Sequence, residues 1–107
     1  MWLFTTQGFY SVVAHRGDPD RVIVRARTEE DIEALRRQIP ELEPFEDASA
    51  DYRWRAIVSR ERWRDATVQL ADAIDYANFK SRVADCQGAE RSARYQHVWA
   101  ELRGLQR

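Results

Sequence analysis

Hydrophobic and polar residues alternate with a period of two in parts of the chain. Residues 52–59 (YRWRAIVS) alternate cleanly and residues 21–27 (RVIVRAR) carry arginine at alternate positions, whereas residues 9–15 (FYSVVAH) are apolar at both odd and even positions. Because successive side chains of a strand point to opposite faces, this pattern predicts three strands, with a further short one at 2–5. A strand that is apolar on both faces is typical of the middle of a sheet.

Apolar residues at helical spacing predict three to four helices between and after these strands. Thr28, Ser59 and Asn78 each precede such a segment. We expect them to be N-caps, because their side-chain oxygens can accept hydrogen bonds from the free N–H groups of a first turn. Pro40 and Gly88 are expected to end the first and third helices, and the last helix runs nearly to the end of the chain.

The order of these elements predicts the fold class. The short turn at 17–20 predicts an antiparallel hairpin of 9–15 with 21–27. The helix that follows predicts that 52–59 runs parallel to 21–27. With the two-sided strand 9–15 in the middle, the sequence predicts an α+β fold. Its sheet would be three-stranded and mainly antiparallel, with order 2-1-3, in a ferredoxin-like split unit that forms a single domain over residues 1–107.

Composition narrows the function classes. The chain has 107 residues, a charged fraction of 33% and a formal net charge of -1, which gives no global attraction to nucleic acid or acidic membranes. One cysteine cannot form an internal disulfide, which is typical of a reducing compartment. The N-terminus lacks the pattern of a signal peptide, and no apolar stretch has the length of a membrane span. We therefore expect a cytoplasmic protein without a membrane partner.

Arginine supplies nearly all of the positive charge, since Lys80 is the only lysine. Four arginines occupy alternate positions within two predicted strands, and His15 ends a third predicted strand nearby. If the strands share one sheet, these side chains stand on one face, and planar guanidinium groups bind phosphate or carboxylate well. The sequence therefore predicts an anion-binding face on a non-enzymatic binding module, with the candidate residues Arg25, Arg27, Arg53, Arg55 and His15.

Two observations qualify this prediction. The acidic segment 41–51 (ELEPFEDASAD) can lie across the basic face and neutralise it internally, with Phe45 returning to the core. Strand alternation also places Tyr52 and Trp54 on the face opposite Arg53 and Arg55. A platform for single-stranded nucleic acid needs aromatic rings beside its arginines, so this alternation disfavours nucleic acid as the partner.

Other residues support two alternative functions. Tyr95, Trp99 and Leu102 form an apolar stripe on the last helix, which predicts an interface in a homodimeric interaction protein. A small enzyme that uses His15 as a general base is the further alternative. Spacings typical of metal ligands and phosphate-binding glycine loops are lacking, so we expect no metal and no cofactor.

Several stretches resemble a family of small uncharacterised bacterial and phage proteins, a domain of unknown function. The resemblance spans most of the chain and implies no activity, ligand or catalytic residue. The matching stretches are FTTQGFYSVV (4–13), DPDRVIVRAR (18–27), DYRWRAIVS (51–59), IDYANFK (74–80) and YQHVW (95–99).

Overall fold

A computed structural model describes residues 1–106 of the chain. The chain forms two compact units, one from Met1 to Ile74 and the other from Asp75 onward. The single domain expected from the sequence stays a prediction. The first unit consists of β1 (Trp2–Phe4), β2 (Phe9–Ala14), β3 (Arg21–Ala26), α1 (Glu29–Ala34), the 3-10 helix η1 (Leu35–Arg37), β4 (Phe45–Glu46), β5 (Trp54–Ser59) and α2 (Arg60–Asp72).

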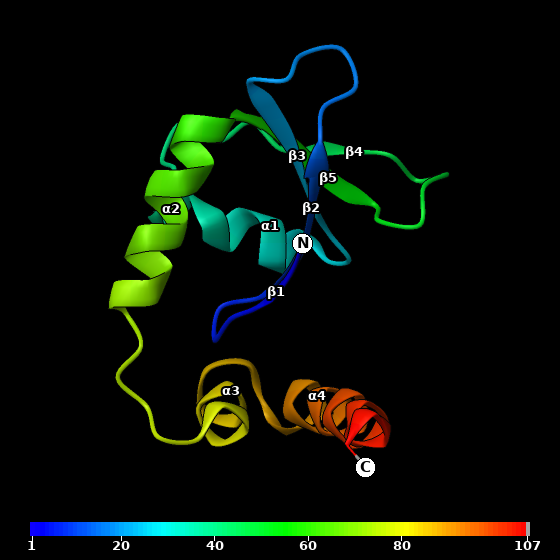
Figure 1. Ribbon diagram of the computed structural model, residues 1–107, viewed down its shortest axis with the longest axis vertical. Helices are drawn as coiled ribbons and strands as arrows, with labels where there is room; N and C mark the ends of the chain where they lie inside the picture. The colour runs from blue at the N-terminus through cyan, green and yellow to red at the C-terminus, as the bar shows by residue number, and fades with distance from the viewer. Residues whose placement is uncertain (107) are drawn as a thin grey trace. The chain divides into compact units, whose positions relative to one another are not determined.

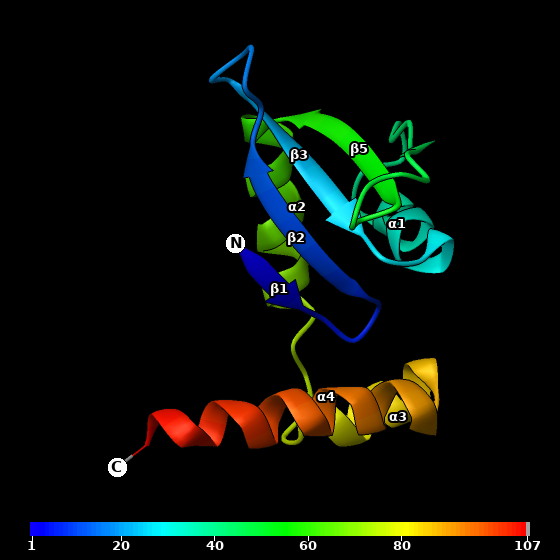
Figure 2. The ribbon, with the colours of Figure 1, turned by 90° about the vertical axis from the view of Figure 1, so that its right-hand side faces the viewer.

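The described strands form one five-stranded sheet in the order β1-β2-β3-β5-β4, and every neighbouring pair is antiparallel. Figure 2 looks onto the strands, with α1 and α2 behind them. The α+β class is therefore confirmed. The predicted order 2-1-3 is wrong, because β3 rather than β2 lies between the other two long strands.

The prediction that 21–27 and 52–59 run parallel is also wrong, because β3 and β5 are antiparallel neighbours. Both β3 and β4 are antiparallel to β5, so β3 and β4 run in the same direction. The strand that follows the helix and runs parallel to β3 is thus β4. The chain then turns back through a hairpin, and β5 takes the position between β3 and β4.

Helices α1 and α2 cover one face of this sheet, as Figure 1 shows. The buried side chains of α1, η1 and α2 include Ile32, Leu35 and Trp63, which belong to the same cluster as the apolar residues of the strands. Full burial of an aliphatic side chain such as Leu35 stabilises the fold by about 1.5–3 kcal/mol. The strand residues of this covered face are Tyr10, Val12, Val22, Val24, Ala26, Ala56 and Val58.

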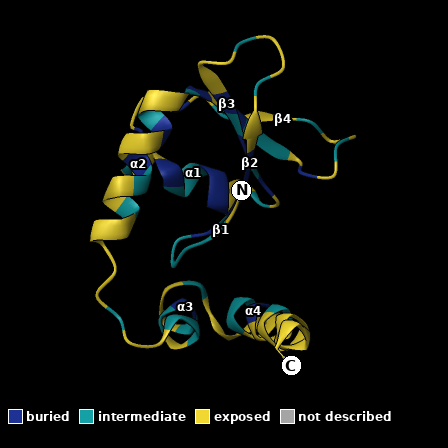
Figure 3. Ribbon diagram, viewed as in Figure 1, coloured by how far each residue is buried: buried dark blue, intermediate teal, exposed yellow. Residues whose placement is uncertain are grey.

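Local capping interactions begin three of the helices. The side chains of Thr28, Ser59 and Asn78 accept hydrogen bonds from the backbone N–H groups of the residues three positions further on. All three predicted N-caps are confirmed. Figure 3 shows that the outer surface of α2 is exposed, as expected for a helix that packs on one side only.

The second unit is a pair of helices, α3 (Phe79–Gln87) and α4 (Ala89–Leu102), followed by the short 3-10 helix η2 (Arg103–Leu105). Gly88 joins α3 to α4 with a φ of 96°, a conformation that residues with a Cβ rarely adopt. Phe79 stacks on Tyr95 with ring centroids 6.0 Å apart. The hydroxyl of Ser92 donates to the backbone carbonyl of Lys80 at 2.8 Å.

Gly8 offers a test of the packing where the chain enters β2. A Cβ built on Gly8 would lie 2.8 Å from the hydroxyl oxygen of Tyr10 and 2.9 Å from Cγ of the buried Asp31. Two hydrogen bonds prevent these side chains from moving away from an added Cβ. The Tyr10 hydroxyl donates to the backbone carbonyl of Asp31, and the Asp31 carboxylate accepts from the backbone N–H of Phe9. We expect Gly8→Ala to lower the free energy of unfolding by about 1–3 kcal/mol, measured by urea denaturation.

The matched control is Gly104→Ala, because a Cβ at Gly104 meets no atom within 4 Å. This variant should unfold at nearly the wild-type urea concentration. Equal stability of the two variants would contradict the close packing around Gly8.

Candidate functional site

The face of the sheet opposite α1 and α2 carries the candidate site, and we call it the open face. Strand register places one residue from each of five strands in a single row across this face. Both ends of the row are exposed aromatic side chains, and two arginines lie between them. In order across the sheet the row is Trp2, Ser11, Arg25, Arg55 and Phe45.

Aromatic rings continue from one end of this row along the sheet. Phe9 stacks on Phe4 with ring centroids 4.5 Å apart, and it meets Trp2 edge to face at 5.8 Å. Phe9 also lies 6.4 Å from the ring of Tyr52. We call Trp2, Phe4, Phe9 and Tyr52 the aromatic strip. Contacts of this kind add about 0.5–1.5 kcal/mol per pair beyond burial, which holds the rings in fixed positions.

Two guanidinium groups stand over the last ring of the strip. The Cζ of Arg25 is 4.7 Å and that of Arg27 is 4.1 Å from the ring centroid of Tyr52. The two charges are therefore at most about 9 Å apart, which is comparable with the Debye length of about 8 Å in physiological salt, so only part of their repulsion remains. The aromatic face offsets part of this repulsion.

Neutral oxygen atoms orient both of these guanidinium groups. Nη2 of Arg25 donates to Oγ of the buried Ser11 at 2.6 Å, and Nη1 of Arg27 donates to the backbone carbonyl of Asp51 at 2.6 Å. Within residues 1–106, neither side chain forms an ion pair with a carboxylate. No carboxylate of the described chain therefore pairs with either guanidinium group, and the hydrogen bonds to Ser11 and Asp51 orient both groups.

The other two predicted arginines contact the acidic segment. Arg55 donates from Nε to the carbonyl of Tyr52 at 3.1 Å, and its Nη2 lies 3.7 Å from the Asp51 carboxylate. Arg53 donates through Nε and Nη2 to one oxygen of Glu46, at 2.9 and 2.7 Å. The segment 41–51 therefore neutralises Arg53 closely and Arg55 loosely. We call Arg25, Arg27 and Arg55 the arginine cluster.

His15 lies at the other end of the strands. It forms the β2–β3 connection, where its N–H donates to the carbonyl of Arg21 and its Nδ1 accepts from the N–H of Gly17. His15 lies four positions beyond Ser11 in the sequence, which is about 13 Å along an extended chain. The structure thus places Ser11 beside Arg25 and leaves His15 outside the arginine cluster.

The residues expected to form an interface on α4 differ in exposure. Tyr95 is buried, whereas Trp99 and Leu102 are exposed. Two cations stand over the Trp99 ring, with Nζ of Lys80 at 4.2 Å and Cζ of Arg103 at 5.2 Å from its centroid. The predicted stripe is therefore not a continuous exposed apolar surface.

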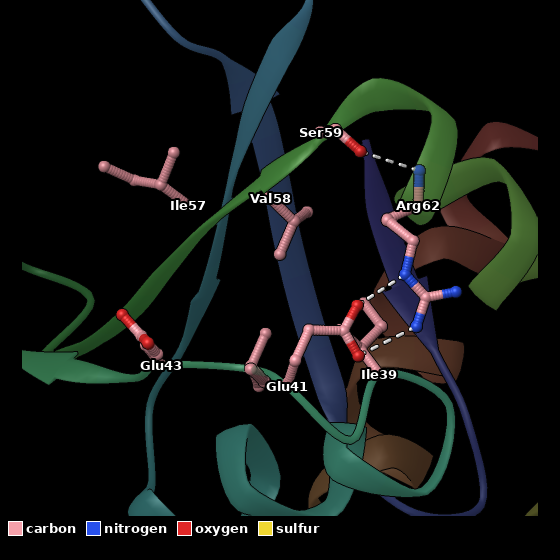
Figure 4. Close-up of a pocket in the computed structure, with 8 residues that line it drawn as sticks. Ile39, Glu41, Glu43, Ile57, Val58, Ser59 and Arg62 are labelled. Atoms are coloured by element: carbon pink, nitrogen blue, oxygen red, sulfur yellow. Dashed lines mark hydrogen bonds and ion pairs between the residues drawn. The ribbon is translucent and has the colours of Figure 1, made fainter.

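A cavity of about 270 Å³ lies beside β5 in the first unit (Figure 4). At its edge, Arg62 forms a bidentate salt bridge with Glu41. Nε donates to Oε1 at 2.6 Å and Nη2 donates to Oε2 at 3.0 Å. The floor is apolar, so the cavity offers little polar chemistry to a ligand apart from this pair and Glu43. Its lining residues are Ile39, Glu41, Leu42, Glu43, Ile57, Val58, Ser59 and Arg62.

Sequence reasoning missed the aromatic residues of the site. Tyr52 was expected on the core side, but it precedes β5, so strand alternation does not apply to it. Its ring is buried beneath the guanidinium groups of Arg25 and Arg27. Phe45 was expected in the core and is 43% exposed, because its register partner is the outward-facing Arg55. The two-sided apolarity of residues 9–15 was the signal for an apolar open face.

Comparisons with protein-family models, with curated proteins and with solved structures gave no match. The resemblance to a family of bacterial and phage proteins therefore stays a prediction. Among residues 1–106, no His, Cys, Asp and Glu side chains gather in a group that could hold a metal ion. None of the described helices combines the length and apolarity needed to cross a membrane.

The Glu41–Arg62 pair predicts a pH dependence of stability. The hydrogen bond from Arg62 holds the pKa of Glu41 below its ordinary value of 4.5. A depressed folded pKa means that the pair stabilises the fold above the unfolded pKa, and that this contribution is lost as the pH falls through the folded pKa. In urea denaturation, wild type and Glu41→Gln should differ most near neutral pH and become alike in acid.

Glu101→Gln, at an exposed position of α4, is the control. The free energy of unfolding of this variant should depend on pH in the same way as that of the wild type. A difference between wild type and Glu41→Gln that stays constant across the acid range would contradict the assigned pair.

Proposed function

We propose that this protein is a non-enzymatic binding module that engages an anionic partner through the open face. The observation that carries the proposal is the pair of guanidinium groups of Arg25 and Arg27 over the Tyr52 ring, oriented by Ser11 and by a backbone carbonyl. Positive charges that lack carboxylate partners in the described chain favour a negative ligand beside them. Phosphate and carboxylate fit the planar donor geometry.

Preorganisation of these side chains adds to the support. A free arginine side chain loses about 0.5–1.5 kcal/mol of rotamer entropy when a ligand immobilises it. Here the ring of Tyr52 and the hydroxyl of Ser11 hold the guanidinium of Arg25 before a ligand arrives. A partner therefore meets donors that are already in place.

The two alternatives have less support. A homodimer through α4 would use Tyr95, which is buried, and Trp99, which already carries two cations. An enzyme would use His15, which lies in a hairpin connection away from the arginine cluster. Both stay predictions.

Arginine side-chain signals in ¹⁵N NMR test the proposal directly. Inorganic pyrophosphate and a hexa-aspartate peptide serve as probes. We expect the Nε–H signals of Arg25, Arg27 and Arg55 to shift on titration. Those of Arg53 and Arg62 should move little, because Glu46 and Glu41 already accept from them.

The double variant Arg25→Gln/Arg27→Gln should bind each probe at least tenfold more weakly, because each charge-assisted hydrogen bond contributes about 1.5–3 kcal/mol. Arg60→Gln/Arg64→Gln removes the same charge from α2 and is the matched control. Equal weakening by both double variants would indicate unspecific charge attraction and would exclude a site at the arginine cluster.

A further inference from the structure

The exposed rings of the open face are not explained by an anion site alone. Trp2 is 68% exposed and Phe45 is 43% exposed, although both are large and apolar. They end the row that contains Arg25 and Arg55. A simple phosphate or carboxylate needs only the guanidinium groups and would leave these rings uncovered.

We infer that the open face binds single-stranded nucleic acid, with phosphates on the arginine cluster and bases stacked on the flanking rings. This inference rests on the proposed function and names its ligand class. Single strands are bound in this way by open surfaces that combine positive charge with aromatic rings, because every base has a face that can stack.

The order of residues along the row fits such a ligand. An aromatic ring stands at each end, Trp2 on β1 and Phe45 on β4, and two guanidinium groups lie between them. Neighbouring strands lie about 4.8 Å apart, so a row across five strands is about 19 Å long. A strand of nucleotides that crosses the sheet would place its backbone over Arg25 and Arg55 and a base on each ring.

The same features disfavour other polyanions. A peptide that offers only carboxylates would meet the arginines and leave Trp2 and Phe45 uncovered. A duplex keeps its bases stacked on one another and offers the open face only phosphates.

The argument from strand alternation against nucleic acid holds for Trp54, which packs against the core, but not for Tyr52. Tyr52 lies beneath the arginines rather than behind them, and Phe9 connects it to Trp2. The rings and the positive charges therefore share one face.

Fluorescence anisotropy with fluorescein-labelled eight-residue oligouridine and oligothymidine tests the inference, and the two probes distinguish RNA from DNA. Trp2→Ala and Phe45→Ala should each weaken oligonucleotide binding at least fivefold, because stacking on one ring contributes about 1–3 kcal/mol per base. Neither should change the binding of hexa-aspartate. Trp99→Ala, at an exposed ring outside the open face, is the matched control and should have no effect.

The salt dependence provides a second readout. Three phosphate contacts on a single strand predict a slope of log K against log salt of about −2, and Arg25→Gln should reduce its magnitude by about 0.7. Arg25→Lys keeps the charge, so it should retain the slope while it loses the stacked, forked geometry. Circular dichroism of each variant establishes that it is folded.

The outcomes separate the two proposals. Oligonucleotide binding that depends on both the rings and the arginines supports the inference. If hexa-aspartate binds through Arg25 and Arg27 but Trp2→Ala leaves oligonucleotide binding unchanged, the inference fails and the proposed function stands. If neither probe binds, both fail. A dimer in sedimentation that Trp2→Ala dissociates would assign the face to a second copy and would also overturn the inference.

Discussion

The register of β3 between β2 and β5 is the constraint on which both faces of the sheet depend. Val22, Val24 and Ala26 of β3 are buried against α1 and α2, so the residues between them must point the other way. A shift of one residue would bury Arg25 and expose the valines. The apolar core therefore determines, through simple alternation, that Arg25 stands on the open face beside Arg55.

Local signals in the sequence predicted much of this structure. The caps at Thr28, Ser59 and Asn78 depend only on the next few residues, and all three form as expected. The strands depend on period-two alternation, which is also local. Strand order is different, because it depends on which distant segments meet. A strand that is apolar on both faces fits the centre of a sheet, and it also fits β2, where Phe9 and Val13 lie on the open face.

In the candidate site, too, the features that depend on local sequence could be predicted, and those that depend on distant segments could not. Arg25 and Arg55 could be placed on one face from alternation within their own strands. The position of Tyr52 could not be predicted from alternation, because β5 begins only at Trp54 and the residues before it are not part of a strand. The partners of Arg53 and Arg55 also depend on the path of segment 41–51. The short strand β4 brings Glu46 to Arg53, an arrangement that charge counts alone do not specify.

The insertion of β5 between β3 and β4 has a consequence for how the chain assembles. A short connection joins β2 to β3 in a hairpin. The pairing of β3 with β5 brings Ala26 to Trp54, so the long segment between these residues must first form a closed loop. Non-local pairings of this kind form late and slow folding. Arg25 and Arg55 come from the two strands that meet in that step. A chain in which β3 and β5 have not yet paired would lack the row of residues across the open face, so the close approach of Arg25 and Arg55 would report completion of the sheet.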